Sequence, residues 1–279
     1  MSDEIIGLHP WFDTPPGQCL LDWERRCFDA AVADLFGFHG VQLGLPLLDG
    51  LAANRMRHRW IVAGPDDLPP HGALPHQTAL VTDFAALPFD TASLDLVLLP
   101  HTLERSPDPH ATLREVERVL MPEGRAVICG LNPAGLWCLR QRRVRLAQRF
   151  GMGRDYLPGA LDPIGYWRLR DWLRLLSFEV ESGRFGCFRP AVRSQRWLDR
   201  HAWMERAGDR WWPFLGAAYF VVATKRVPGM RLIGKRWKKA RRAPAVAAPV
   251  PIAGRAGGAG AEARFASQDT TTKTKKQTP

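Results

Sequence analysis

The sequence predicts an α/β domain with a doubly wound, mostly parallel sheet, followed by a basic tail. Three observations lead to this prediction. Short, entirely apolar runs alternate with helical segments, and strands of that kind have to be covered on both faces. Two extended runs between residues 178 and 225 are typical of an antiparallel closing pair. Beyond residue 229 the chain is rich in Ala, Pro, Gly and Arg, a composition that cannot bury a core.

The N-terminal region is expected to precede the domain proper. Residues 1–22 hold several prolines around Trp11 and Phe12, which predicts an irregular arm with two aromatic anchors. From residue 23 to Gly37 apolar side chains recur at helical spacing, so this segment is expected to be an amphipathic helix. The domain itself is expected to span residues 23–228.

The sheet and its covering helices are expected in alternation along this domain. The strands are expected at residues 41–45, 60–63, 79–82, 94–99, 126–131, 178–185 and 217–225. The helices that follow the first are expected at residues 47–57, 109–120, 167–176 and 191–207. Asp108 before Pro109 is typical of a helix start, because Asp caps the first amides and proline fits the first helical position.

The net charge of +11 belongs to the tail. From Lys225 onward there are 14 basic and 2 acidic residues, which leaves 25 basic and 26 acidic residues before that point. Residues 229–279 are therefore expected to be a disordered basic tail. The run KRWKKARR could attract RNA, DNA or anionic lipid without sequence specificity, or could only keep the chain soluble.

The cysteines and the first residues of the chain bear on metal binding and on the cellular compartment. The five cysteines are odd in number and none is paired at the spacing of structural zinc sites, so buried or incidental thiols and no metal are expected. The acidic start is unlike a signal peptide, and no apolar run approaches the ~20 residues that span a bilayer. A cytoplasmic protein without a transmembrane segment is expected.

The most specific signal is one ungapped stretch from Asp83 to Gly130. Its motifs, in order, are Asp83, Leu87-Pro88-Phe89, Asp95, LERSPDP at 103–109 and RVLMPEG at 118–124. The stretch resembles the methyltransferase type 11 family, in which an acid and an LPF turn follow the third strand and an Asp opens the fourth. In that family LEHVPDP then leads into a helix that ends RVLKPGG. With weaker support, the resemblance extends over residues 23–225.

This resemblance implies a class I, Rossmann-like fold with a seven-stranded sheet and an antiparallel last strand, and S-adenosylmethionine as the cofactor. Cofactor contacts are expected at the carboxyl ends of the strands. Asp83 would accept a hydrogen bond from the adenine amino group, and Phe84 would border the ring. Leu99, Pro100 and His101 would line the sulfonium end. Asp83 could instead only cap a helix, and His101 could be only a solvated loop residue.

The first strand departs from the family pattern. Where the family has the turn DLGCGTG, residues 41–48 read VQLGLPLL. Gln42 stands in place of the acid, Gly44 is retained, and Leu45 and Pro46 follow where glycine is expected. Proline removes one N–H and fixes its own φ, so cofactor binding through Gln42, Gly44 and Leu45 should be weakened or rerouted.

The end of the second strand lacks the acid that would hold the ribose hydroxyls. Asp66 and Asp67 lie a few residues late, so they could serve only through a loop bend.

Taken as a whole, the resemblance implies a methyltransferase that acts on a small-molecule acceptor. The alternative is a degenerate methyltransferase-like binding or scaffold protein without catalysis.

Catalytic and acceptor residues are less well indicated. The sulfonium is already activated, and a base is needed only if the acceptor must lose a proton, so His101 is a weak candidate and no catalytic residue is obligatory. Residues 188–214 place Trp197, Trp203, Trp211 and Trp212 among arginines. This insertion could form a lid over an acidic or flat apolar substrate, or its tryptophans could pack onto the sheet. Oligomeric state is not indicated.

Removing the tail should leave the domain intact. A chain that ends at Gly229 is expected to melt within a few degrees of the full chain, because the removed residues are too polar to contribute core. Calorimetric melting of both chains checks this. A shortened chain that aggregates would show that the tail is part of the fold.

Overall fold

The computed structural model describes residues 8–67, 78–150, 155–158 and 161–226. The tail expected at residues 229–279 lies outside the described residues. The helices are α1 (Leu8–Phe12), α2 (Pro15–Val32), η1 (Pro65–Asp67), α3 (Thr102–Arg105), α4 (Pro109–Val119), α5 (Leu136–Gln148), α6 (Tyr166–Leu175), α7 (Gln195–Arg200), α8 (Trp203–Trp211) and η2 (Pro213–Leu215). The strands are β1 (His39–Leu43), β2 (His58–Ala63), β3 (Thr78–Val81), β4 (Leu94–Pro100), β5 (Leu120–Leu131), β6 (Phe178–Gly186) and β7 (Ala218–Lys225).

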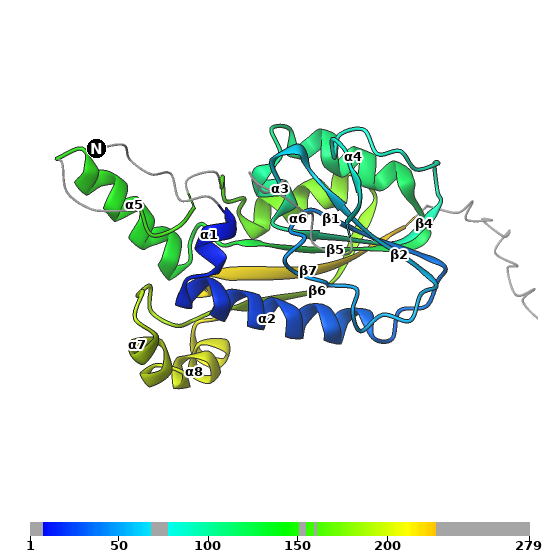
Figure 1. The fold of residues 1–279 in the computed structure, drawn as a ribbon. Helices are drawn as coiled ribbons and strands as arrows, with labels where there is room; N and C mark the ends of the chain where they lie inside the picture. Colours follow the sequence, from blue (N-terminus) through cyan, green and yellow to red (C-terminus); the bar gives the residue numbers. More distant parts are fainter. Residues whose placement is uncertain (1–7, 68–77, 151–154, 159–160, 227–279) are drawn as a thin grey trace, which may run out of the picture. The chain divides into compact units, whose positions relative to one another are not determined.

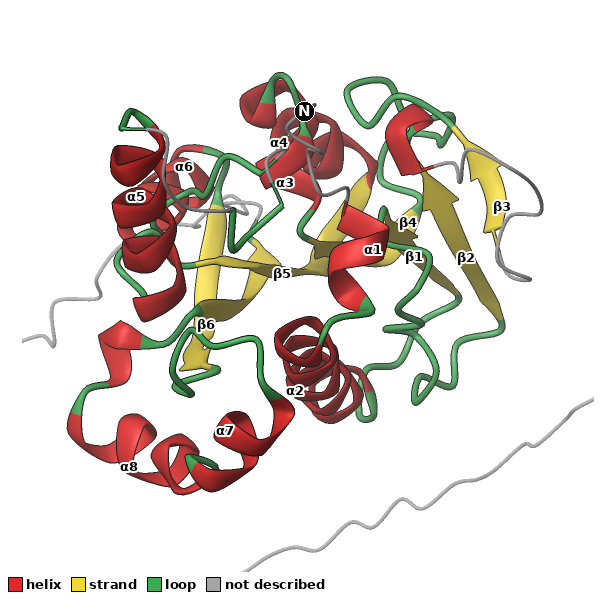
Figure 2. Cartoon of the chain, turned by 60° about the vertical axis from the view of Figure 1, so that its left-hand side comes forward, coloured by secondary structure: helices red, strands yellow, loops and turns green. Residues whose placement is uncertain are grey.

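The strands form one seven-stranded sheet in the order β3-β2-β1-β4-β5-β7-β6, and Figure 2 shows β3 beside β2 at one edge. Strands β1 to β5 pair in parallel, whereas β7 is antiparallel to both of its neighbours. The order reverses between β1 and β4, which is the point where ligands bind in open sheets of this kind. The predicted fold class, a mostly parallel sheet with an antiparallel last strand, is confirmed.

Two layers of helix cover the sheet, and each layer has its own core (Figures 1 and 2). On one face α2 buries Phe28 and Val32 against residues of β4 and β5. On the other face α4 and α6 bury Leu113 and Leu169, among others, against the opposite sides of the same strands. Alternate residues of β4 and β5 therefore enter different cores, which is why these strands are apolar throughout.

None of the helices in the described part of the chain is long and apolar enough to cross a membrane.

The N-terminal region is more regular than expected, because α1 and α2 together replace most of the predicted arm. Thr14 caps α2 by accepting a hydrogen bond from the amide of Gly17, and prolines occupy the first two helical positions. Because prolines are tolerated there, the helix starts eight residues before residue 23, at Pro15. Trp11 and Phe12 are almost fully buried, so the predicted aromatic anchors are confirmed.

Two predicted helices differ from the structure. Residues 47–57 contain turns and no helix, because the Gln42 side chain, described below, binds the backbone of this segment. The helix predicted at 191–207 is two short helices, α7 and α8, which are separated by His201 and Ala202. The Asp108 cap of α4 is as predicted, and it accepts hydrogen bonds from the amides of His110 and Ala111 at 3.0 Å.

Asp95, one of the motif residues, has a structural role at the opposite edge from the strands' carboxyl ends. Its Oδ2 accepts hydrogen bonds from the amides of Phe38 and His39 at 2.8 and 2.9 Å. These two amides belong to the start of β1, whereas Asp95 lies at the start of β4. The carboxylate therefore fixes where the central strand β1 enters the sheet.

Replacing Asp95 should destabilise the domain. Asp95→Ala leaves two backbone amides without their charged acceptor, so the free energy of unfolding should fall by about 1 to 3 kcal/mol. Urea unfolding measures this, with Asp90→Ala, at an exposed neighbouring position, as the control. Equal stability of the two variants would contradict the role given to Asp95.

Candidate functional site

The carboxyl ends of β1 and β2 form a cradle around two glycines, Gly44 and Gly64. Gly44 has a φ of 79°, and a Cβ built on it would lie 3.5 to 3.6 Å from Thr102 Oγ1, Asp67 Oδ2 and Phe84 Cζ. A Cβ on Gly64 would lie 3.1 Å from the same Phe84 ring and 3.3 Å from the Asp67 carboxylate. Because both positions lack side chains, the Phe84 ring and the Asp67 carboxylate pack closely against the backbone of the two strand ends.

Gln42 organises the turn that follows β1. Its Nε2 donates to the carbonyl oxygens of Gly44, Leu45 and Leu48 at 3.1, 3.1 and 2.5 Å, and its Oε1 accepts from the amide of Gly50 at 2.8 Å. The Gln42 side chain is fully buried, and these bonds to the loop backbone engage both of its polar atoms. Gln42 therefore holds the loop in a non-helical form and does not face the cradle as a ligand would require.

Leu45 also serves the fold and lies away from the cradle. Its φ is 45°, and its side chain is fully buried in the core beneath α2. Because no helix follows β1 within residues 44–57, the amides of a helix N-terminus are missing at this turn. Of the three candidates predicted on the first strand, Gly44 is the one that reaches the cradle.

The chain bends after β2 as Asp67 would require in order to reach the end of that strand. The 3-10 turn η1 brings the Asp67 carboxylate back over the end of β2, where its Oδ2 accepts from the amide of Gly64 at 2.7 Å. Its Oδ1 is paired with the guanidinium of Arg105, from the end of α3. Asp67 is fully buried, and no motif in the sequence indicated that Arg105 would be its partner.

Asp83 and Phe84 lie after β3, at the rim of the cradle. Asp83 is exposed, and its Oδ1 accepts from the amide of Ala85 at 2.9 Å, so one carboxylate oxygen caps its own turn. Phe84 is partly buried and its ring lies against Gly44 and Gly64. The structure therefore brings Phe84, Asp67 and the two glycines together, with Asp83 at the edge.

Leu99, Pro100 and His101 form the end of β4 and are all buried. His101 has a φ of 54° and lies between two carboxylates from different elements. Its Nε2 is 2.6 Å from Glu24 Oε1 of α2, and its Nδ1 is 2.7 Å from Glu104 Oε2 of α3. It is a buried ion-pair residue and not the solvated loop residue that was considered from the sequence.

The charges around His101 decide its protonation. Burial by itself would lower the pKa of His101, but the neighbouring charges of Glu24 and Glu104 and their hydrogen bonds raise it to about 10. Burial raises the pKa of Glu104, and the nearby His101 opposes that rise. At neutral pH His101 is therefore an imidazolium, which has no free lone pair with which to accept a proton.

Glu24 was missed by the sequence reasoning although it left a signal. Leu20, Glu24 and Phe28 recur every four residues, so the acid lies on the apolar face of α2. Cys129 Sγ lies 3.5 Å from Glu24 Oε1 and completes a group of metal-ligand types within 4.8 Å of one another. Both nitrogens of His101 are at hydrogen-bond distance from carboxylates, so the cluster is built as a hydrogen-bonded ion network.

The N-terminal aromatic residues cover this network. The rings of Phe12 and His101 are 6.2 Å apart, and Trp11 Nε1 donates to the carbonyl of Tyr156 at 2.8 Å. These contacts bring α1 over the ends of β4 and β5, as Figure 2 shows. Helix α1 therefore covers the buried ion network from the side of the strands' carboxyl ends.

The predicted insertion, residues 188–214, lies away from the cradle and from the ion network. Figure 2 shows α7 and α8 beside α2 and the end of β6. The four tryptophans are 36% to 74% exposed, so the interpretation that they pack onto the sheet is wrong. The helix that carries Trp203 and Trp211 is instead one wall of a separate cavity, described below.

The stability of the domain should fall as the pH rises through the range in which His101 titrates. The folded pKa, about 10, lies above the ordinary value of 6.5. The stabilisation is therefore fully present below pH 6.5 and is lost as the pH approaches 10, by an amount on the order of a few kcal/mol.

His101→Gln should be less stable than the unaltered protein at pH 6.5 and should show a flatter profile above it. Urea unfolding at several pH values measures this, with His58→Gln, an exposed imidazole, as the control. If His101→Gln retains the full pH dependence, the titrating group lies elsewhere.

Comparison with known proteins agrees with the fold and the motifs. Residues 66–128 match the methyltransferase domain of the type 11 family. The chain is 30% identical over 223 residues to the uncharacterized protein YafS of Escherichia coli (strain K12). The aligned residues make up 80% of this chain and 82% of YafS. A SAM-dependent methyltransferase from Thermotoga maritima has the same fold, with a TM-score of 0.52 and 15% identity over 78% of this chain and 94% of its own.

The matched segment contains Asp67, Phe84 and β4, whereas Gly44 and Gly64 lie before it, so the family match covers one side of the cradle. The sheet order, the motifs and the relative point to one conclusion. The chain belongs to the same family as YafS, and it carries the methyltransferase domain of the type 11 family on a Rossmann-like fold.

Proposed function

We propose that the chain binds S-adenosylmethionine in the cradle of Gly44 and Gly64 and transfers its methyl group to a small-molecule acceptor. The observation that carries this proposal is the pair of glycines at the neighbouring ends of β1 and β2, against which the Phe84 ring and the buried Asp67 carboxylate pack. When bound, the cofactor supplies an activated methyl group, so the protein mainly has to hold and orient the two reactants.

The residues of the cradle suit the adenosine half of the cofactor. Asp67 already binds Gly64 and Arg105, but each carboxylate oxygen can accept a second hydrogen bond, which leaves capacity for the ribose hydroxyls. Phe84 would border the adenine ring. Asp83 caps its turn with one oxygen, and its second oxygen would accept from the adenine amino group.

Arg105 would replace the free helix amides that the altered first turn lacks. A helix after β1 would offer free amides to the cofactor's carboxylate, but Gln42 and Pro46 keep this segment non-helical. Arg105 is nearly buried beside Asp67, and a guanidinium has donors left after one ion pair. We assign the cofactor's carboxylate to Arg105, which rests on charge and position.

His101 would position the site and would not act as a base. As an imidazolium between Glu24 and Glu104 it cannot take a proton from an acceptor at neutral pH. An acceptor atom that already has a free lone pair therefore fits this site best. A cavity of about 190 Å³ at the end of β5 is lined by Leu131 and Leu157 among others, and it would take a small acceptor. Leu131 connects this cavity to the ion network, because its amide donates to Glu104.

Calorimetric titration of the full chain with S-adenosylmethionine and S-adenosylhomocysteine tests the proposed function. Micromolar dissociation constants and a ligand-dependent rise in Tm are expected. An absence of both heat and stabilisation at millimolar ligand would overturn the proposal and favour a methyltransferase-like binding or scaffold protein.

Substitutions should separate the two halves of the cofactor. Asp83→Ala should weaken binding of both S-adenosylmethionine and 5′-methylthioadenosine, which lacks the amino-acid part, by about 1 to 3 kcal/mol. Arg105→Ala should weaken binding of S-adenosylmethionine by a similar amount and leave 5′-methylthioadenosine nearly unaffected. Calorimetry with both ligands measures this. Equal losses for both ligands in Arg105→Ala would show that Arg105 acts only through Asp67.

A further inference from the structure

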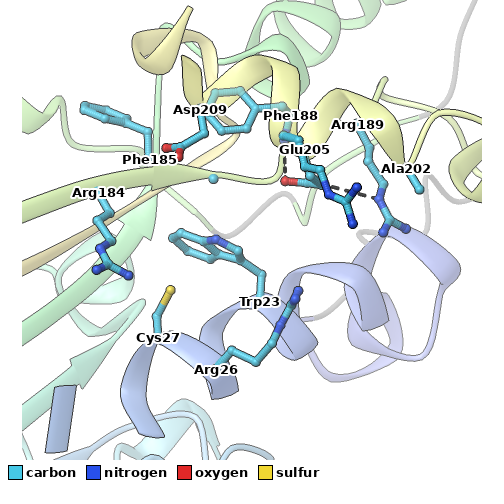
Figure 3. Close-up of a pocket in the computed structure, with 12 residues that line it drawn as sticks. Trp23, Arg26, Cys27, Arg184, Phe185, Phe188, Arg189, Ala202, Glu205 and Asp209 are labelled. Atoms are coloured by element: carbon cyan, nitrogen blue, oxygen red, sulfur yellow. Dashed lines mark hydrogen bonds and ion pairs between the residues drawn. The ribbon is translucent and has the colours of Figure 1, made fainter. Parts of the chain in front are cut away.

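A second cavity lies between α2, β6 and α8 and shares no lining residue with the cradle (Figure 3). Its volume is about 660 Å³, which is within the usual range of small-molecule sites. Three separate parts of the chain supply its walls, so it exists only in the folded domain. The insertion predicted as a lid forms one of these walls.

The cavity is rich in arginine. Arg26, Arg184, Arg189 and Arg206 line it, whereas its acids are Glu205 and Asp209. Arg189 is partly neutralised by Glu205, at 3.6 Å. Among the described residues, Arg26, Arg184 and Arg206 make no ion pair with a carboxylate.

Aromatic side chains form the apolar part of the same cavity. The Trp23 ring is half-buried against Gly186, and Phe188 follows β6 in the cavity wall, whereas the ring of Phe185 points to the other face of the sheet (Figure 3). Guanidinium groups beside aromatic rings suit a ligand that combines an anionic group with a flat or apolar body.

The outer face of α8 extends this apolar character beyond the cavity. Trp203 and Trp211 are 60% and 74% exposed, on the helix that also carries Arg206. Large exposed aromatic residues beside arginines mark a binding surface more often than an inert one. A ligand whose apolar part extends out of the cavity would find a surface there.

We propose that this cavity binds the phosphate group of a ligand with an apolar body. Phosphate is favoured because guanidinium groups bind its oxygens with strong, charge-assisted and often bidentate hydrogen bonds. The same chemistry occurs in soluble aromatic phosphates and in phospholipid headgroups. The proposal is independent of the proposed methyl transfer, because the cavity and the cradle share no residue.

Two probes distinguish these sources, both with the full chain. Calorimetry measures binding of 1-naphthyl phosphate. Flotation measures binding to vesicles of phosphatidylcholine with or without about one-third phosphatidylglycerol, at a salt concentration that screens the tail. Binding of either probe is expected, and which one binds identifies the source.

Charge reversal shows whether the cavity is responsible. Arg184→Glu with Arg206→Glu should weaken the binding of that probe about tenfold or more. The matched control, Arg114→Glu with Arg143→Glu, changes two exposed arginines outside the cavity and should have little effect. Glutamine at positions 184 and 206 gives a milder pair if the first does not fold, and Tm and S-adenosylmethionine binding report the fold.

Absence of binding to both probes would overturn the proposal. Equal losses in the cavity pair and the control pair would also overturn it, because they would indicate general attraction of a polyanion to a basic chain.

Discussion

The ion network of Glu24, His101 and Glu104 connects more of the structure than any other interaction. It joins α2, the end of β4 and α3, and Glu104 also accepts from the amide of Leu131 at the end of β5. All three side chains are buried, so breaking one pair would leave an uncompensated charge. These bonds hold α2 and α3 against the carboxyl ends of β4 and β5.

A second constraint acts at the first turn. In place of a glycine-rich loop that leads into a helix, one buried amide side chain binds a non-helical loop and leucines fill the space beneath α2. The loop is therefore rigid without any ligand. In the proposed site the positive charge that a helix start would offer has to come from another element, and the guanidinium of Arg105 would supply it.

The sheet could be predicted almost strand by strand, because strands that are buried on both faces leave long apolar runs in the sequence. The site could be predicted only in part. Motif spacing predicted that Gly44 and Phe84 lie near the cofactor, and both lie in the cradle. Arg105 and Glu24 were not predicted, because their ion-pair partners are distant in sequence. Gln42 was predicted as a cofactor contact because spacing shows where a residue stands, and not which way its side chain turns.

Helix α2 carries one member of each site at consecutive positions. Glu24 faces the ion network under the strand ends, whereas Trp23 faces the arginine-lined cavity. A rigid helix cannot shift one of these residues without moving the other. A ligand that displaced α2 at the cavity would therefore also move Glu24, whereas a side-chain substitution that leaves the helix in place would not.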